Sequence, residues 1–210
     1  MNKTIFVSGI DTDAGKTYAT GWIAKQLMKS GKKVATVKFI QTGCQDFSED
    51  IVKHREIMGI NLPEDETGLT SPIIFKYPAS AQLAARLENR QIDLNLVDNA
   101  LQELENHYDI VLLEGAGGLM VPITDDFQSI DYAQTRNLPI ILVTNGVLGS
   151  INHTLLSLEA IKTRDLKLHS LAYNSYFDND HIIADDTKGF LKRYIKKNFP
   201  KTQWIEIPTL

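Results

Sequence analysis

The residues best suited to chemistry lie near the start of the chain, in the segment Gly9-Ile10-Asp11-Thr12-Asp13-Ala14-Gly15-Lys16-Thr17. Its closing Gly-Lys-Thr is typical of a phosphate-binding loop, in which backbone N–H groups at a helix start point at an anion. Lys16 can reach terminal phosphates as a point charge, and the Thr17 hydroxyl can ligate Mg²⁺. The alternative, a turn with a chance Gly-Lys-Thr, is disfavoured because a strand pattern precedes the segment and a helix pattern follows it.

Two further ionisable residues come directly after apolar segments. Glu114 follows Ile110-Val111-Leu112-Leu113 and precedes a glycine-rich turn, at the position where phosphate-loop NTPases hold Mg²⁺ with a carboxylate. Lys38 follows the apolar run 34–37, and a cation there would stabilise a developing anion. Each residue also has a plain interpretation: Glu114 as a solvated carboxylate at a strand end, and Lys38 as an ordinary surface charge.

Three weaker candidates lie in turns and at helix starts. Asp50 falls in the first turn of an expected helix, where acidic residues often only complement the helix dipole. Thr42 precedes a glycine, and a hydroxyl at that place is common in turns. The segment Leu148-Gly149-Ser150-Ile151-Asn152-His153 opens a helix whose free N–H groups could bind a carboxylate. No spacing of His or Cys residues predicts a zinc site.

Strand and helix patterns alternate along the chain. The expected strands cover 4–7, 34–39, 110–113, 138–144, 168–173 and 204–207, residues 71–75 are expected as a strand or an extended segment, and residues 41–43 are expected as a loop. The expected helices cover 18–27, 48–59, 80–88, 94–105, 129–135, 150–163 and 180–198. This order predicts an α/β fold, a single-domain P-loop NTPase-like fold over 1–210 with a mainly parallel β-sheet and helices on both faces. The loops after the strands should therefore converge at the carboxyl edge of the sheet.

Composition limits the classes of function. The net charge of −4 argues against a general nucleic-acid binder, although a small anion could still be held in a local basic pocket. Cys44 is the single cysteine among 210 residues, which excludes an intramolecular disulfide and suits a reducing cytosol. No apolar run approaches the ~18 residues of a membrane span, and no signal-peptide pattern opens the chain. We expect a cytoplasmic protein with no nucleic-acid or membrane partner.

Several of these motifs together resemble the dethiobiotin synthetase family. The matching segments are 6–17, Lys38-Phe39-Ile40-Gln41-Thr42-Gly43, Val111-Leu112-Leu113-Glu114-Gly115-Ala116-Gly117-Gly118, 148–153 and Glu206-Ile207-Pro208. They span nearly the whole chain in the family's order. Five residues separate Gly9 from Gly15 where a generic phosphate loop has four, and this wider gap is the family's own pattern.

The resemblance implies an ATP- and Mg²⁺-dependent cyclo-ligase of biotin biosynthesis. Such an enzyme carboxylates 7,8-diaminononanoate (diaminopelargonate) with CO₂ and closes the ureido ring through a carbamate and a carbamic–phosphoric anhydride. The products are dethiobiotin, ADP and phosphate. The resemblance further implies a homodimer, in which the turn at 149–152 binds the substrate carboxylate and reaches across to the partner's site.

The resemblance also implies roles for particular residues. Lys16 and Lys38 are expected to be catalytic, and the expected Mg²⁺ ligands are Thr17, Asp50 and Glu114. The expected nucleotide contacts are Asp13, Ala14, Gly15, Lys16, Thr17, Tyr18, Glu114, Gly115, Ala116, Gly117, Asn174, Ser175, Pro208, Thr209 and Leu210. The expected substrate contacts are Thr12, Lys38, Thr42, Gly149, Ser150, Ile151 and Asn152.

The chain departs from the family pattern at two positions. Ile10 stands where a threonine is expected, and Phe39 stands where a proline usually follows the lysine, which bears on the stiffness of the loop after Lys38. The chain ends at Leu210, just after the Pro208 segment, so nucleotide preference stays open. The sequence also leaves open whether CO₂ or bicarbonate is captured and which amine reacts first.

Two other classes share the deviant loop or the fold. Partitioning and positioning ATPases usually carry a second lysine inside the loop, and none stands between Gly9 and Lys16. Amide ligases of corrin biosynthesis usually add a glutamine-hydrolysing domain, for which 210 residues leave no room. Both comparisons favour the small-molecule ligase.

Overall fold

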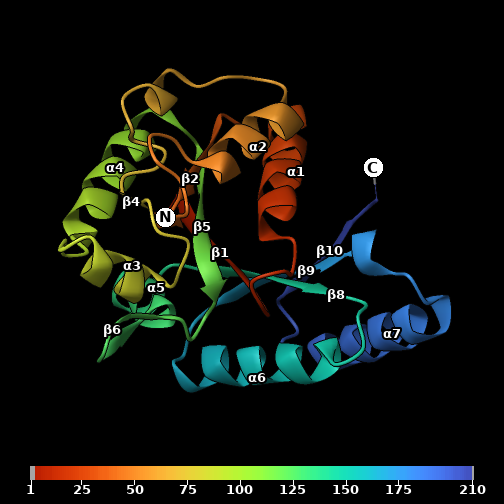
Figure 1. Cartoon of the computed structure of the whole chain (residues 1–210). Helices are drawn as coiled ribbons and strands as arrows, with labels where there is room; N and C mark the ends of the chain where they lie inside the picture. Colours follow the sequence, from red (N-terminus) through yellow and green to blue (C-terminus); the bar gives the residue numbers. More distant parts are fainter. Residues whose placement is uncertain (1–2, 210) are drawn as a thin grey trace.

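A six-stranded parallel sheet forms the centre of the computed structural model, which describes residues 3–209. The strand order is β10-β9-β8-β1-β5-β2, as Figure 1 shows. The bounds are β1 (Thr4–Gly9), β2 (Val34–Lys38), β5 (Ile110–Gly118), β8 (Ile140–Asn145), β9 (Leu168–Asn174) and β10 (Gln203–Ile207). Every residue of β1, β2 and β8 is buried, which is why these strands have nearly continuous apolar sequences.

Helices cover both faces of this sheet. Their bounds are α1 (Lys16–Lys29), α2 (Glu49–Met58), α3 (Ala81–Leu87), α4 (Leu94–His107), α5 (Ser129–Thr135), α6 (Ser150–Thr163) and α7 (His181–Asn198), with short 3₁₀ turns η1 (Pro63–Asp65) and η2 (Ser175–Phe177). Alternate side chains of β1 enter two separate cores: Ile5 and Val7 lie in a core with residues of α1, whereas Phe6 lies in a core with residues of α3 to α7. Because strand side chains alternate between faces, this confirms the predicted α/β fold with helices on both faces.

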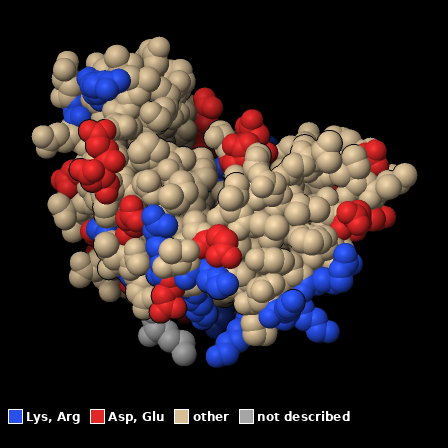
Figure 2. Space-filling model, turned by 90° about the horizontal axis from the view of Figure 1, so that it is seen from below, with Lys and Arg blue, Asp and Glu red and all other residues tan. Residues whose placement is uncertain are grey.

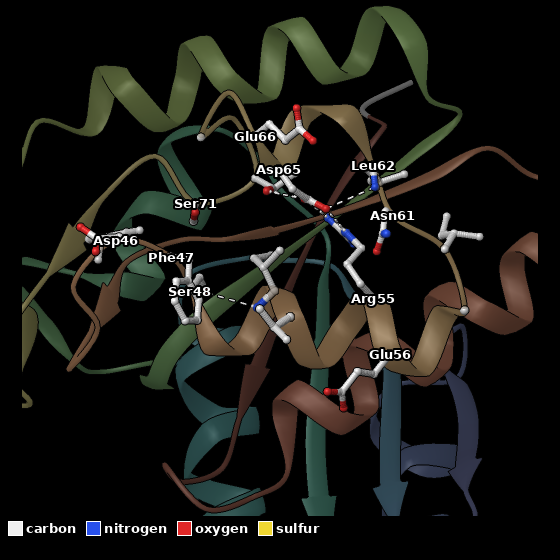
Figure 3. Close-up of a pocket in the computed structure, with 17 residues that line it drawn as sticks. Asp46, Phe47, Ser48, Arg55, Glu56, Asn61, Leu62, Asp65, Glu66 and Ser71 are labelled. Carbon is white, nitrogen blue, oxygen red and sulfur yellow. Dashed lines mark hydrogen bonds and ion pairs between the residues drawn. The ribbon is translucent and has the colours of Figure 1, made fainter.

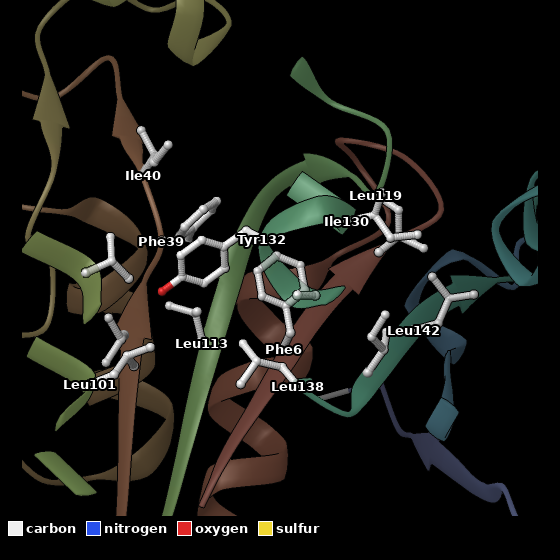
Figure 4. Packing of buried hydrophobic residues seen from close by; sticks show 14 of the residues in the cluster. Phe6, Phe39, Ile40, Leu101, Leu113, Leu119, Ile130, Tyr132, Leu138 and Leu142 are labelled. Atoms are coloured by element: carbon white, nitrogen blue, oxygen red, sulfur yellow. The ribbon is translucent and has the colours of Figure 1, made fainter. Parts of the chain in front are cut away.

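The loop after β2 is held by aromatic packing. Phe39 is fully buried, with its ring centroid 5.8 Å from that of Phe6 and 4.6 Å from that of Tyr132 (Figure 4). The Phe39 backbone N–H also donates to the Glu114 carbonyl oxygen at 2.8 Å, a bond that a proline could not make. The phenylalanine therefore fixes this loop by burial and by a main-chain hydrogen bond.

The pairings of two small sheets were not predicted, although β4 (Ile74–Phe75) lies within the segment 71–75 expected as a strand or extended. Residues 41–43 were expected as a loop, but β3 (Gln41–Thr42) pairs in parallel with β4 (Ile74–Phe75). The antiparallel pair β6 (Pro122–Thr124) and β7 (Phe127–Gln128) had no counterpart in the prediction. Strands of two or three residues are too short to show an alternating pattern. None of the helices between residues 3 and 209 combines the length and the apolar character that crossing a bilayer requires.

Candidate active site

The register of β2 and β5 places Lys38 directly beside Glu114, because the two are paired positions on neighbouring parallel strands. Lys38 Nζ donates to Glu114 Oε1 at 2.8 Å and to the Gly115 carbonyl oxygen at 3.3 Å. It also forms an ion pair with Asp50, at the start of α2. A cation is thus held between two carboxylates at the carboxyl edge of the sheet.

Both members of the central pair are buried. Lys38 is 5% exposed and Glu114 is 0% exposed, so the interpretations as a surface lysine and a solvated carboxylate are wrong. Burial opposes the charge on each group, but their mutual attraction outweighs it. The pKa of Glu114 is therefore lowered well below its ordinary value, with Lys38 as the larger and His54 as the smaller contribution. The pKa of Lys38 is raised, because Glu114 and Asp50 outweigh the cost of burial.

Three side-chain oxygen atoms, one each from α1, α2 and β5, meet at this pair. Thr17 Oγ1, in the first turn of α1, lies 3.0 Å from Asp50 Oδ1 and 3.0 Å from Glu114 Oε1. Between residues 3 and 209 no group of three or more His, Cys, Asp or Glu side chains could hold a metal. Two carboxylates and one hydroxyl still fit Mg²⁺, which takes oxygen ligands and is usually completed by water and substrate phosphates.

A cap sets the position of Asp50. Ser48 Oγ accepts a hydrogen bond from the Ile51 backbone N–H at 3.2 Å, which fixes the start of α2. The same hydroxyl donates to Gln41 Oε1 at 2.6 Å, so the helix start is tied to β3. The first turn of α2 is thereby fixed facing Lys38.

The phosphate loop closes tightly over the start of α1. Gly15 has φ +80°, and a Cβ at this position would lie 2.2 Å from Asn174 Nδ2. No side chain caps α1, so its first N–H groups are available to an anion. Lys16 Nζ donates to the carbonyl oxygens of Asp11 and Thr12 at 2.9 and 3.0 Å. Burial, and then repulsion from Lys38, lower the pKa of Lys16 to about 8.

The expected nucleotide contacts lie along this edge. Asn174 Nδ2 donates to the Ala14 carbonyl oxygen at 3.4 Å, and Thr209 Oγ1 donates to the Ser175 carbonyl oxygen at 3.4 Å. The end of β9 and the segment after β10 therefore lie beside the phosphate loop and η2. The other expected contacts span a range of exposure: Asp13 and Pro208 are exposed, Tyr18, Ala116 and Gly117 are half-buried, and Gly115 is buried. Leu210 lies outside the described residues.

The expected substrate contacts are less closely grouped. Thr12 lies close to the glycine turn after β5, since a Cβ on Gly117 would be 3.6 Å from Thr12 Oγ1. Over residues 3–209, no hydrogen bond or ion pair links Thr42 or the 149–152 turn to Lys38 or Glu114. In that turn Ser150 is buried and bonded to Asn145, Ile151 is half-buried, and Gly149 and Asn152 are exposed.

One residue of the centre was missed by the sequence analysis. His54 is fully buried, and its Nε2 lies 2.6 Å from Glu114 Oε2. Its Nδ1 lies 3.0 Å from Thr36 Oγ1. The signal that could have found it is its spacing of four residues from Asp50, which puts both side chains on one face of α2.

A separate hollow lies beyond α2. It has a volume of about 810 Å³ and is lined by residues of α2 and of the segments on either side of it, including Ser48, Arg55 and Asp65 (Figure 3). Arg55 Nε and Nη2 donate to the two Asp65 carboxylate oxygens at 2.7 and 2.8 Å. Neither Lys38 nor Glu114 lines this hollow, so it is distinct from the buried centre.

Comparisons with known proteins place the chain among named relatives. A family model described as "AAA domain" matches residues 3–200. The ATP-dependent dethiobiotin synthetase BioD 2 of Pasteurella multocida is 49% identical over 96% of this chain and 95% of its own length. That of Haemophilus ducreyi is 50% identical over 98% of each chain. The ATP-dependent dethiobiotin synthetase BioD of Chlorobaculum tepidum is 43% identical, over 99% of this chain and 87% of its own.

Solved structures with much lower sequence identity share the fold of this chain. A putative plasmid partition protein of Borrelia burgdorferi, bound to AMPPNP, superposes with a TM-score of 0.55 at 14% identity. That match covers 98% of this chain and 87% of the other. The signal recognition particle receptor FtsY of Elizabethkingia anophelis superposes with a TM-score of 0.53 at 16% identity, and the match covers 99% of this chain and 57% of the other. These likenesses agree with a P-loop NTPase-like fold.

Proposed function

The chain belongs to the dethiobiotin synthetase family, and we propose that it makes dethiobiotin at the centre formed by Lys38, Glu114 and the phosphate loop. It is an ATP-dependent ligase of biotin biosynthesis that acts on 7,8-diaminononanoate. The single observation that carries the assignment to this centre is a buried lysine held by two carboxylates, within reach of a phosphate loop. A mere phosphate-binding loop does not need that second buried cation.

The proposed reaction brings two anions together. One amine of the substrate takes up CO₂ as a carbamate, whose oxygen attacks the γ-phosphorus of ATP and releases ADP. The second amine then attacks the carbonyl carbon of the mixed anhydride, closes the ring and expels phosphate. Lys38 and Lys16 supply the positive charge that offsets repulsion between carbamate and phosphate. Fixed positions in a site held by α1, α2 and β5 supply proximity.

The residues fit a magnesium ion. We propose that Thr17, Asp50 and Glu114 hold it, since their oxygens already converge. When bound, the ion would supply charge neutralisation at the phosphate oxygens. Within the chain, Lys38 favours the ionised form of Glu114 and holds both carboxylates in place by ion pairs.

The remaining contacts are proposed from their place along the same edge. The loop residues 13–18, the glycine turn 114–117, Asn174, Ser175 and the segment 208–210 would bind nucleotide. Thr12, Lys38 and Thr42 would contact the diamine. Asn174 supports this arrangement best, because it already packs against the phosphate loop. The whole chain, 1–210, would act as one domain.

We also propose a homodimer in the cytoplasm. Leu148 is 82% exposed and Leu156 is 63% exposed, and Met120 and Leu156 line a hollow of about 430 Å³ beside Ile10. Figure 2, which has α6 toward the viewer, shows a broad area without charged side chains. Covering such a surface with a second copy would remove apolar area from water. It would also bring the 149–152 turn to a neighbouring site, where the turn would bind the substrate carboxylate.

The assay supplies purified protein with 7,8-diaminononanoate, bicarbonate and Mg-ATP. We expect phosphate release that requires the diamine, and a product with the mass of dethiobiotin. ATP hydrolysis that proceeds without the diamine and yields no dethiobiotin would contradict the assignment and favour a nucleotide switch.

A further inference from the structure

A histidine in α2 contacts the central carboxylate from the side away from Lys38. His54 Nε2 lies 2.6 Å from Glu114 Oε2, whereas Lys38 Nζ and Thr17 Oγ1 lie 2.8 and 3.0 Å from Oε1. The two oxygens of Glu114 therefore have different partners. Oε2 belongs to the histidine, and Oε1 faces the lysine and the threonine.

The arrangement follows from two periodicities. Thr36 and Lys38 are two residues apart on β2 and share one face of the strand. Asp50 and His54 are four residues apart on α2 and share one face of the helix. Lys38 pairs with Asp50 and Thr36 with His54, so the helix and the strand meet in two adjacent polar contacts.

Hydrogen-bond donors fix the direction of this network. Arg55 Nη1 lies 2.7 Å from Thr36 Oγ1, and an arginine can only donate. Thr36 Oγ1 accepts that bond, and its own proton is left to donate to His54 Nδ1 at 3.0 Å. His54 then carries a proton on Nε2 and donates it to Glu114 Oε2 at 2.6 Å. Each polar hydrogen of the three side chains in this chain of bonds finds an acceptor.

The far end of the network is anchored. Arg55 makes two further hydrogen bonds to Asp65, and Thr70 Oγ1 donates to Asp65 Oδ1 at 2.7 Å. Figure 3 shows the guanidinium of Arg55 directed at Asp65. The histidine is thus held by a chain of side chains that ends in a different segment of the fold.

We propose that His54 is a positioning residue: it holds Glu114 by Oε2, so that Oε1 alone is presented to the magnesium ion beside Thr17 and Asp50. This inference rests on the proposed function of Glu114 as a metal ligand. Outer partners that orient a ligating carboxylate typically contribute 10- to 100-fold in metal affinity. His54 is expected to act within that range without touching substrate.

The test measures Mn²⁺ binding to the protein in the presence of ADP, by electron paramagnetic resonance of the free ion, with no turnover. In His54→Leu we expect the dissociation constant for Mn²⁺ to rise roughly 10- to 100-fold. The affinity for ADP without metal should change by less than about twofold, because the hydrogen bonds of His54 go to Glu114 and Thr36 and not to the phosphate loop. His54→Gln keeps an N–H donor and is expected to regain most of the Mn²⁺ affinity.

Two more variants separate positioning from stability. Thr36→Val leaves the histidine in place but removes the hydroxyl that bonds to Nδ1 and so keeps the proton of His54 on Nε2. It should weaken Mn²⁺ binding less than His54→Leu does. The double variant should bind no more weakly than His54→Leu. Ser170→Ala, which removes a buried hydroxyl bonded to His169, is the matched control and should leave Mn²⁺ binding unchanged.

The outcomes are distinct. Mn²⁺ binding by His54→Leu as tight as that of the unaltered protein, or no recovery in His54→Gln, would overturn the positioning role. If His54→Leu does not fold, Thr36→Val and His54→Gln decide the question alone, and unchanged Mn²⁺ binding in Thr36→Val would overturn it. Failure of the unaltered protein to bind Mn²⁺ with ADP would instead contradict the proposed metal site.

Discussion

Lys38→Met is the substitution that most directly probes the buried centre. Methionine keeps much of the length and apolar volume of the lysine but removes its charge. Asp50 and Glu114 would then face each other without the cation that lies between them. The substitution separates an electrostatic role from a packing role.

The expected loss of stability follows from burial. Glu114 is 0% exposed, and removing one partner of a buried ion pair typically costs about 3–5 kcal/mol. Glu114 keeps its contact with His54, so we expect the lower part of that range. For a chain of this size, each kcal/mol corresponds to roughly 2–4 °C, and Tm should therefore fall by roughly 6–12 °C for about 3 kcal/mol.

Thermal unfolding without metal, and again with increasing Mg²⁺, measures the effect. Without Lys38 the two carboxylates gain more from a divalent cation, so Mg²⁺ should raise the Tm of Lys38→Met more than that of the unaltered protein. Lys188→Met is the matched control, because Lys188 also bridges two carboxylates, Asp178 and Glu206. The side chains of Lys188 and Glu206 are 20% and 46% exposed, against 7% and 0% for Lys38 and Glu114, so Lys188→Met should lose less stability than Lys38→Met.

Equal stability losses in Lys38→Met and Lys188→Met would refute the reasoning from burial. An equal Mg²⁺ effect on Lys38→Met and the unaltered protein would show that Lys38 does not share its carboxylates with the metal site. Turnover should be lost in Lys38→Met while ADP binding is kept.

Three further predictions concern the phosphate loop and its support. The pKa of Lys16 is lowered to about 8, so ATP binding at pH 8 should raise that pKa and take up protons. Calorimetry in buffers of different ionisation enthalpy measures this proton uptake. Lys16→Arg stays charged and should abolish it. Gly15→Ala should lose more than about tenfold in ADP affinity, since the position has φ +80° and its Cβ would clash with Asn174. Gly31→Ala is the control, because Gly31 has φ +87° but open space around it. It should reduce the free energy of unfolding by about 1 kcal/mol without changing ADP binding. Phe39→Ala should lower the free energy of unfolding, measured by chemical denaturation, by about 3–5 kcal/mol, because the ring is fully buried and packs against Phe6 and Tyr132. A decrease below about 1 kcal/mol would contradict the role of Phe39 in holding the loop.

The sequence predicts the parts of the site that depend on local patterns. Lys38 and Glu114 each follow an apolar run, and parallel strands end at a common edge, so their convergence could be expected. Lys38 and Glu114 are paired positions only because β2 and β5 are neighbouring strands of the sheet. That order, β2 beside β5 beside β1, cannot be read from alternating strands and helices alone.

Burial was the property that the sequence left open. A lysine at a strand end looks the same whether or not a helix covers it, and the cover here comes from α2 through Asp50. His54 was missed for a related reason. Its partners come from β2 and β5, and a histidine in a helix reveals nothing of its partners in strands 18 and 60 residues away along the chain.

The central claim is that one centre joins carbamate and γ-phosphate before the ring closes. Mixing C¹⁸O₂ with the diamine, Mg-ATP and the protein in ordinary water tests this directly, with mass spectrometry of the released phosphate. The proposed anhydride leaves one oxygen of the carbamate on phosphorus, so early phosphate should carry one ¹⁸O atom. Unlabelled phosphate, formed alongside dethiobiotin, would contradict the claim.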